Sequence, residues 1–315
     1  MTSNQAVFPE VDVEQTVLNA PKRRPVPLHL IAILTAFATL GIAAIAMAAP
    51  ASAAASALPA SAPADSGPTT NVDIHMDASL GGLNFGSITM QAKLGTTSYS
   101  ASSTIRTEGI TDHLFKTVYN LKTEGTRGSK QMQTAKYYSF SHSDDDKQQV
   151  DMTYGTNGLP LVAAQPAYDI SARVTATARH LKNTIDPLSA MIVPVATPSA
   201  EACNRRIPVY DGRRRYDFVM SFERMSPLED RKGYSGPAVR CQAYLRPIAG
   251  YKRKSIREMR QDPMPITVWL APVDGADALV PARIEVSTPI GRMVARSTRF
   301  TVSKANPSQA ALSAQ

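Results

Sequence analysis

The stretch Ile207-Pro208-Val209-Tyr210-Asp211-Gly212-Arg213-Arg214-Arg215-Tyr216-Asp217-Phe218 decides the fold prediction. Its Asp-Gly pair stands between two runs in which apolar and polar residues alternate. Asp-Gly tolerates the positive φ angles of a tight type I′ hairpin turn, so the pair is a strong hairpin signal. A two-residue turn would set Val209 opposite Arg214. Arg214 is then expected on the more apolar face, where its head group needs a partner.

The same hairpin carries a cluster of basic side chains within eleven residues: Arg205, Arg206, Arg213, Arg214 and Arg215. Planar guanidinium groups bind phosphates and carboxylates through paired hydrogen bonds, so we predict a candidate anion-binding site here. The alternative is a solvated strand edge whose arginines pair with acidic side chains of the same region. Those side chains are Glu201, Asp211 and Asp217.

Strand patterns continue on both sides of this hairpin. Apolar residues recur at every second position from Val72 to Leu94, interrupted by Gly81 and Gly82. This period of two indicates antiparallel strands with one solvated face. Further strands are expected at residues 99–105, 117–123, 132–142, 150–154, 207–209, 214–223, 238–247, 266–271, 282–287 and 291–302. We therefore predict a mainly β fold, a large curved antiparallel sheet or open barrel of about 10–12 strands.

One helical insert is expected within this sheet. The alternation fails between residues 160 and 200, and residues 170–194 have helix-compatible spacing. Asp186 and Pro187 fit the N-cap and first turn of a short helix, which would cross one face or close one end of the sheet. We also expect a corner at residues 112–115 and a solvated hairpin tip at residues 143–147.

The N-terminal segment has the pattern of an export signal. Lys22-Arg23-Arg24 precedes an uncharged apolar run from Leu28 to Ala49 and then small-residue A-x-A sites. The run is also long enough to cross a bilayer, at roughly 20 residues per crossing. Two outcomes stay open for residues 1–53: a cleaved signal, or an inner-membrane anchor at residues 28–48. Both leave the remaining chain in the periplasm.

The rest of the chain divides into three parts. Residues 54–70 are rich in Ala, Ser and Pro and are predicted to form a disordered spacer. Residues 304–315 are expected to be a disordered tail of the same kind. Residues 71–303 are long enough to bury a substantial core and are predicted to form a single β domain.

Charge and cysteine content set further expectations. The net charge of +8 predicts attraction to anionic partners, a lipid surface or an anionic envelope polymer, whereas export argues against nucleic acid. Cys203 and Cys241 are the two cysteines, and in an oxidising compartment we expect them to form a disulfide. Closing this loop would stabilise the fold by roughly 4 kcal/mol.

Signals for an enzyme are missing. The sequence has no H-E-x-x-H, no G-x-S-x-G and no glycine-rich phosphate loop, and its histidines are scattered. We therefore predict a non-enzymatic protein with no catalytic residues, metal site or cofactor. A hydrolase would require Asp, His and Ser side chains to converge in one cleft. Trp269 lies in an apolar run and is expected to be a core residue.

Several segments in a fixed order resemble one known family. They are Asp186-Pro187-Leu188-Ser189-Ala190, then Cys203, Val209 to Tyr216, Cys241, Pro247 to Gly250, and Val280 to Ile284. This set is similar to the bacterial exported family called domain of unknown function 3108 (DUF3108). The resemblance implies an envelope location and a mainly β fold, and it brings no established reaction. It also suggests a fold similar to the half-barrels of lipoprotein carriers, which hold an acyl chain against a concave sheet.

Two function hypotheses follow. The first is a periplasmic β protein that binds a lipid or another amphipathic envelope component on the apolar concave face of the sheet, with the arginine cluster near the rim. The second is a structural or protein-interaction module whose sheet is filled by its own side chains. The segment around Asp186 to Met191 decides between them, because it either leaves the concave face open or plugs it.

Overall fold

The computed structural model of the chain describes residues 67–108, 116–143 and 146–304. The predicted export segment, most of the spacer, the corner at residues 112–115, two residues of the hairpin tip and the C-terminal tail lie outside this range. Within the described part, no helix combines the length and apolar character needed to cross a bilayer.

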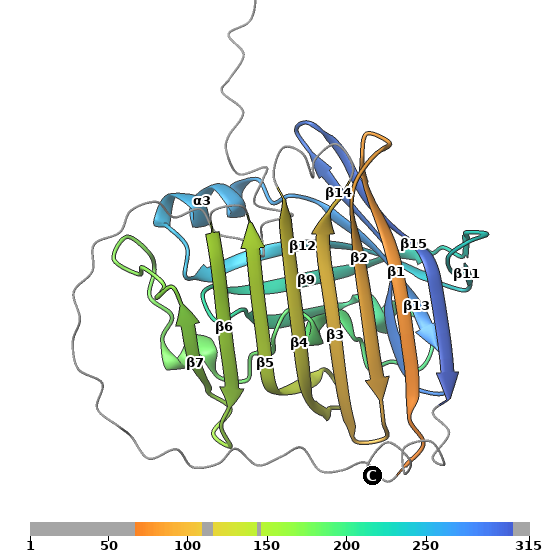
Figure 1. Cartoon of the computed structure of the whole chain (residues 1–315), viewed down its shortest axis with the longest axis horizontal. Helices are drawn as coiled ribbons and strands as arrows, with labels where there is room; N and C mark the ends of the chain where they lie inside the picture. Colours follow the sequence, from red (N-terminus) through yellow and green to blue (C-terminus); the bar gives the residue numbers. More distant parts are fainter. Residues whose placement is uncertain (1–66, 109–115, 144–145, 305–315) are drawn as a thin grey trace, which may run out of the picture. The chain divides into compact units, whose positions relative to one another are not determined.

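The fold is mainly β, as predicted. Thirteen strands form one antiparallel sheet that is not closed, in the order β7-β6-β5-β4-β3-β2-β1-β15-β14-β13-β12-β9-β8 (Figure 1). Their bounds are β1 Thr70–Leu80, β2 Leu83–Leu94, β3 Ser98–Thr107, β4 Thr117–Arg127, β5 Met132–Ser143, β6 Asp146–Tyr154, β7 Pro160–Gln165, β8 Arg205–Tyr210, β9 Arg215–Met225, β12 Val239–Ala249, β13 Ile266–Val273, β14 Ala278–Thr288 and β15 Gly291–Lys304. β10 (Leu228–Glu229) and β11 (Ser235–Gly236) form a separate short pair. The sequence missed β7, because its side chains are mostly exposed and do not alternate.

Period-two patterning produces the strands as expected. In β1 the residues from Thr70 to Ala78 are buried at every second position, and those between them are partly exposed. Gly81 and Gly82 connect β1 to β2 with φ angles of 58° and 91°. Residues with a Cβ atom rarely adopt such φ angles, so glycines are favoured at this turn.

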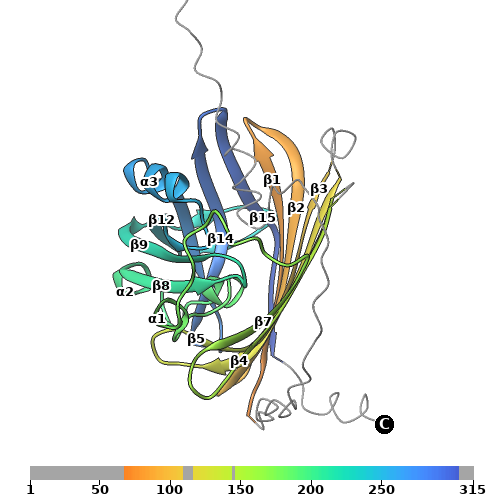
Figure 2. The ribbon, with the colours of Figure 1, turned by 90° about the vertical axis from the view of Figure 1, so that its left-hand side faces the viewer.

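The sheet folds back on itself and encloses the core. Figure 2 shows β1, β2 and β3 on one side and β8, β9 and β12 on the other, with β14 and β15 between them in sheet order. One core cluster joins β1, β2 and β4 and includes Val72, Met90 and Leu121. The other joins β8, β9, β12 and β13 and includes Val209 and Val268.

The turn at Asp211 and Gly212 differs from the prediction. Val209 pairs with Tyr216 and Tyr210 with Arg215, so the turn has four residues rather than two. The Asp211 side chain causes the difference, because its Oδ1 accepts hydrogen bonds from the backbone N–H groups of Arg213 and Arg214. The expected pairing of Val209 with Arg214 is therefore wrong, and Arg214 lies in the turn.

Helical structure is also distributed differently from the prediction. The expected insert at residues 170–194 contains only the four-residue α1 (Ala178–Leu181) and a 3₁₀ turn (Ser189–Met191). Two further helices are α2 (Ala200–Cys203) and α3 (Arg253–Gln261). The sequence did not predict α3, whose core-facing signal is weak because no residue of the helix is buried.

The predicted disulfide between Cys203 and Cys241 is confirmed. The two Cα atoms are 5.4 Å apart, and the bond joins residues separated by 38 positions. Both cysteines are fully buried in the second core cluster. The bond therefore ties the end of α2 to β12, the third strand from the β8 edge of the sheet.

Candidate functional site

The segment from Thr184 to Val193 covers the concave face of the sheet. Ile185 forms a parallel bridge to Val209 of β8, and its backbone carbonyl accepts a hydrogen bond of 2.9 Å from the Tyr210 N–H. Val193 exchanges backbone hydrogen bonds of 2.9 and 2.8 Å with Leu279 of β14. Backbone hydrogen bonds therefore hold both ends of this segment in place.

Apolar side chains of this covering segment fill the interior. Leu188 is 3% exposed and Ile192 is 2% exposed, and both belong to the core cluster built on β1, β2 and β4. Ile185 and Val193 belong to the second core cluster. The segment from Thr184 to Val193, called the plug below, therefore fills the concave face. This filling is what the self-filled hypothesis requires.

Asp186 anchors the plug by hydrogen bonds. Its Oδ1 accepts hydrogen bonds of 2.9 Å from the backbone N–H groups of Leu188 and Ser189, as expected for the predicted cap. Its Oδ2 accepts hydrogen bonds from the hydroxyls of Thr123 (2.8 Å), Thr134 (2.6 Å) and Ser189. Burial raises the pKa of the Asp186 carboxyl, and these hydrogen bonds oppose the rise. Asp186 and Ser189 are both fully buried, so this motif holds the plug in place.

The strand arginines of the predicted anion site bind protein groups. Arg206 and Arg215 both pair with the buried carboxylate of Asp217, and the Arg215–Asp217 distance is 2.7 Å. Arg205 donates hydrogen bonds of 3.0 Å to the backbone carbonyls of Glu201 and Lys130. These contacts match the alternative of an ion-paired strand edge, and an anion site at these residues stays a prediction.

The turn arginines help to close the open side of the sheet. Arg213 donates hydrogen bonds to the backbone carbonyls of Gln165 (3.3 Å), the last residue of β7, and Pro166 (3.0 Å), the next residue. Gly212 has φ +88°, and a Cβ there would lie 2.3 Å from the Val150 side chain of β6. Arg214 lies over the ring of Tyr251, with 5.7 Å between the guanidinium carbon and the ring centroid. The Asp-Gly-Arg turn thus packs against the far end of the same sheet.

Trp269 is a core residue, as predicted. Its side chain is 6% exposed and its indole N–H donates a 3.1 Å hydrogen bond to the Ser226 hydroxyl. The guanidinium carbons of Arg240 and Arg283 lie 4.9 and 5.0 Å from its ring centroid. These cation–π contacts stabilise the stacking of Trp269 between two arginines on the neighbouring strands β12 and β14.

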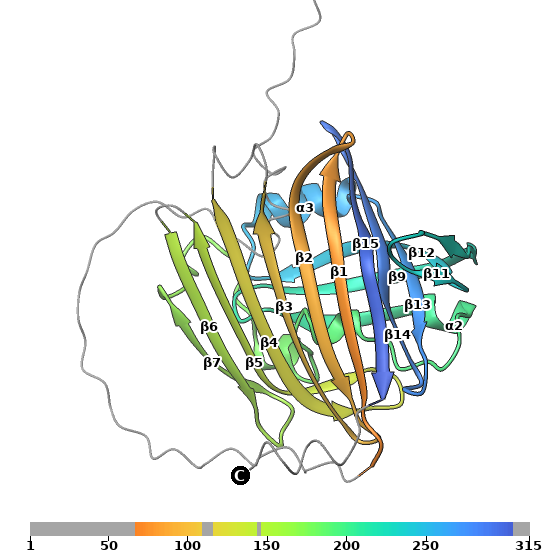
Figure 3. The same cartoon turned by 45° about the vertical axis from the view of Figure 1, so that its right-hand side comes forward.

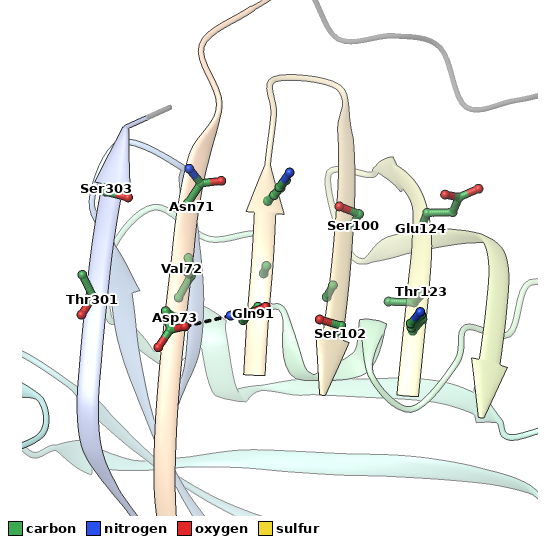
Figure 4. A pocket seen from close by; sticks show the side chains of 14 residues that line it. Asn71, Val72, Asp73, Gln91, Ser100, Ser102, Thr123, Glu124, Thr301 and Ser303 are labelled. Atoms are coloured by element: carbon green, nitrogen blue, oxygen red, sulfur yellow. Dashed lines mark hydrogen bonds between the residues drawn. The ribbon is translucent and has the colours of Figure 1, made fainter. Parts of the chain in front are cut away.

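A groove lined mostly by polar residues crosses the outer face of the sheet over β15, β1, β2, β3 and β4 (Figure 4). Its volume is about 530 Å³. Because side chains alternate along each strand, the residues between the buried positions point outward into it. The polar lining side chains are Asn71, Asp73, Gln91, Lys93, Ser100, Ser102, Lys122, Glu124, Thr301 and Ser303.

The carboxylates of the groove already have partners. The Asp73 carboxylate accepts a 3.0 Å hydrogen bond from the Gln91 amide and a 2.8 Å hydrogen bond from the Arg299 guanidinium. The Gln91 hydrogen bond, followed by the contact with Arg299, lowers the pKa of Asp73. Glu124 pairs with Lys136 at 2.9 Å.

Two lysines also line the groove, and unlike its carboxylates they have no oppositely charged partner among the described residues. Lys93 and Lys122 are exposed and form no ion pair within the described residues. The groove therefore offers hydroxyls, amides and two cationic groups to a ligand. The sequence did not predict it, because period-two patterning shows only that these residues face outward. Their assembly into one groove depends on the register of five strands.

Comparison with known families decides the assignment. The family described as "Protein of unknown function (DUF3108)" matches residues 73–297. The chain belongs to this family. The DUF3108 match includes both the Asp186 plug and the Asp-Gly-Arg turn, and it confirms the resemblance found in the sequence.

Comparison with solved structures gives a more distant likeness. Among solved structures the chain is similar to a beta-barrel-like protein of domain of unknown function DUF1849 from Brucella abortus. The two share 10% identity over 76% of this chain and 99% of that chain, with a TM-score of 0.42. No curated protein matches the chain.

Proposed function

We propose that this DUF3108 member is an exported, non-enzymatic interaction module of the cell envelope that binds an anionic, hydroxyl-rich polymer in its outer groove. The observation that carries the proposal is the lining of the groove, which combines hydroxyls and amides with the cationic groups of Lys93 and Lys122. The predicted export signal supports the proposal, because an exported domain would meet envelope polymers, many of which are polyhydroxylated and anionic.

The chemistry of the groove suits such a ligand. Serine and threonine hydroxyls both donate and accept hydrogen bonds, and the amides of Asn71 and Gln91 do the same, so sugar hydroxyls find partners of either kind. Lys93 and Lys122 supply charge-assisted hydrogen bonds to phosphate, sulfate or carboxylate groups. The extended outer face allows a polymer to bind across several strands without entering the core.

Removing the groove lysines is expected to weaken binding of an anionic polyol. We predict that Lys93→Gln/Lys122→Gln lowers the affinity of the full chain for dextran sulfate roughly ten- to thirtyfold, because each exposed charge contact contributes about 1 kcal/mol. Isothermal titration calorimetry in a non-ionic detergent measures this effect. Uncharged dextran, tested in parallel, is expected to bind more weakly than dextran sulfate to the unaltered chain.

A matched variant separates groove binding from net charge. Lys147→Gln/Lys232→Gln removes the same charge from exposed positions outside the groove and is expected to change the affinity less than threefold. Equal losses in the two variants would contradict a groove site. Equal affinity for dextran and dextran sulfate would contradict an anionic ligand.

The filled interior argues against a lipid bound on the concave face. Because Leu188 and Ile192 occupy that face, we expect protein purified from its own envelope to show the apo mass in native mass spectrometry. The unaltered chain is compared with the variant Leu188→Ala/Ile192→Ala. Truncation of these two side chains opens space in which a lipid could bind. A stoichiometric lipid adduct on the unaltered chain would restore the lipid-carrier hypothesis.

A further inference from the structure

Two hairpin turns lie side by side at one end of the domain. Leu80, the last residue of β1, pairs with Leu83 of β2 and with Met293 of β15. The Gly81 N–H also donates a 3.2 Å hydrogen bond to the carbonyl of Arg292. The β1–β2 and β14–β15 turns are therefore neighbours, as Figure 3 shows at the upper end of the strands.

Each of these turns exposes a large apolar side chain. Leu83 is 71% exposed and Ile290, in the turn between β14 and β15, is 57% exposed. In β2, Leu83 is followed by positions that become buried from Phe85 onward, so its exposure is a property of the hairpin tip. Exposure of such side chains to water is unfavourable, whereas the interfacial region of a bilayer accepts them.

Helix α3 brings positive charge to the same end of the domain (Figure 1). The helix packs against β12, and its apolar residues Ile256 and Met259 are half-buried. Lys252, Arg253 and Arg257 are exposed and form no ion pair within the described part of the chain. The acidic residue of the helix, Glu258, lies 3.8 Å from Lys254. The outward face of α3 is therefore strongly cationic.

We propose that this end of the domain docks on an anionic lipid bilayer. The cations of α3 bind headgroup phosphates, while Leu83 and Ile290 enter the interface between headgroups and acyl chains. A bilayer fits better than an acidic protein, because the two apolar side chains protrude at turn tips and a protein partner would need a contiguous complementary patch. Positive charge and protruding apolar tips at one end match a flat anionic surface with an apolar interior.

Docking in this orientation leaves the outer groove accessible. Asn71 and Ser303 of the groove pair with each other near the beginning of β1 and the end of β15, whereas the two turns lie at the opposite end of these strands. The membrane proposal concerns a separate surface and does not rest on the proposed function of the groove.

Site-specific fluorescence tests the docking surface. The full chain is labelled with an environment-sensitive dye at Leu83→Cys or Ile290→Cys and reconstituted with vesicles of phosphatidylcholine, with or without phosphatidylglycerol. We expect a blue shift at both positions that requires phosphatidylglycerol and is reversed by salt. Leu161→Cys on β7, where the leucine is 73% exposed, is the matched labelling control and is expected to show no such shift.

Charge variants complete the test. Lys252→Gln/Arg253→Gln/Arg257→Gln is expected to lose most of the blue shift at position 83. Lys130→Gln/Lys232→Gln/Lys304→Gln, which removes the same charge from exposed positions away from these turns, is expected to retain it. An equal shift at position 161, a shift independent of phosphatidylglycerol, or equal loss in both triple variants would overturn the proposal. Because the readout is the position of the domain on vesicles, its failure is distinct from a failure of polymer binding.

Discussion

Asp186→Ala is expected to lower the free energy of unfolding by about 4–5 kcal/mol, because the variant leaves buried hydrogen-bond donors without an acceptor. The Asp186 carboxylate accepts hydrogen bonds from two backbone N–H groups and three hydroxyls. All three hydroxyls have a second partner, since Thr123 also contacts the Lys136 carbonyl, Thr134 the Ser189 hydroxyl and Ser189 the Tyr99 hydroxyl. The expected loss is therefore smaller than the sum over five donors.

Chemical denaturation followed by circular dichroism measures this loss. Asp186→Asn keeps the shape and one carbonyl acceptor, so we expect it to lose less stability than Asp186→Ala. Asp73→Ala, which removes an outer-face carboxylate paired with Arg299, is the surface control and is expected to change stability by less than about 1 kcal/mol. If Asp186→Ala behaved like this control, the plug would not depend on its carboxylate.

The dependence of stability on pH provides a second readout of Asp186. Burial raises the pKa of this carboxyl in the folded state, so the folded protein binds its proton more tightly than the unfolded chain does. The stabilising contribution is complete below the unfolded pKa of about 4 and is lost as the pH rises through the folded pKa. We expect the difference in unfolding free energy between the unaltered chain and Asp186→Asn to follow this course. Opposite behaviour would mean that the hydrogen bonds outweigh burial.

Cys203→Ala/Cys241→Ala is expected to lower the free energy of unfolding by about 4 kcal/mol. The disulfide closes a loop between residues 38 positions apart, and on the chain-entropy model most of its effect comes from restricting the unfolded chain. Both cysteines are buried and alanine is small and apolar, so no unsatisfied polar group is introduced. The loss is measured by denaturation of the variant and of the unaltered chain under non-reducing conditions.

Reduction of the unaltered protein offers an independent check. Denaturation in the presence of a thiol reductant should reproduce the destabilisation of the double variant, whereas the double variant itself should not respond to the reductant. A double variant as stable as the oxidised protein would show that packing of α2 against β9 and β12 holds this region without the bond.

The sequence by itself determined the features that depend on local pattern and composition. Period-two alternation specified the strands, because one face of each strand is buried and the other is solvated. Two cysteines in a chain with a predicted export signal indicated the disulfide. Asp186 before Pro187 specified a capped turn, since the carboxylate reaches backbone N–H groups only two and three residues ahead. The order of these segments was sufficient to indicate the DUF3108 family.

Tertiary structure alone decided how these elements are used. The filled interior requires Leu188 and Ile192 to meet strands more than sixty residues away, and the outer groove requires the register of five strands. The Asp211 carboxylate changed the two-residue turn into four residues, because its hydrogen bonds with Arg213 and Arg214 compete with the tighter turn. The arginines near this turn looked like a ligand site in sequence, yet in the fold they bind Asp217 and carbonyls of distant segments. Such partners depend on contacts between residues far apart in the chain, and the local sequence pattern does not predict these contacts.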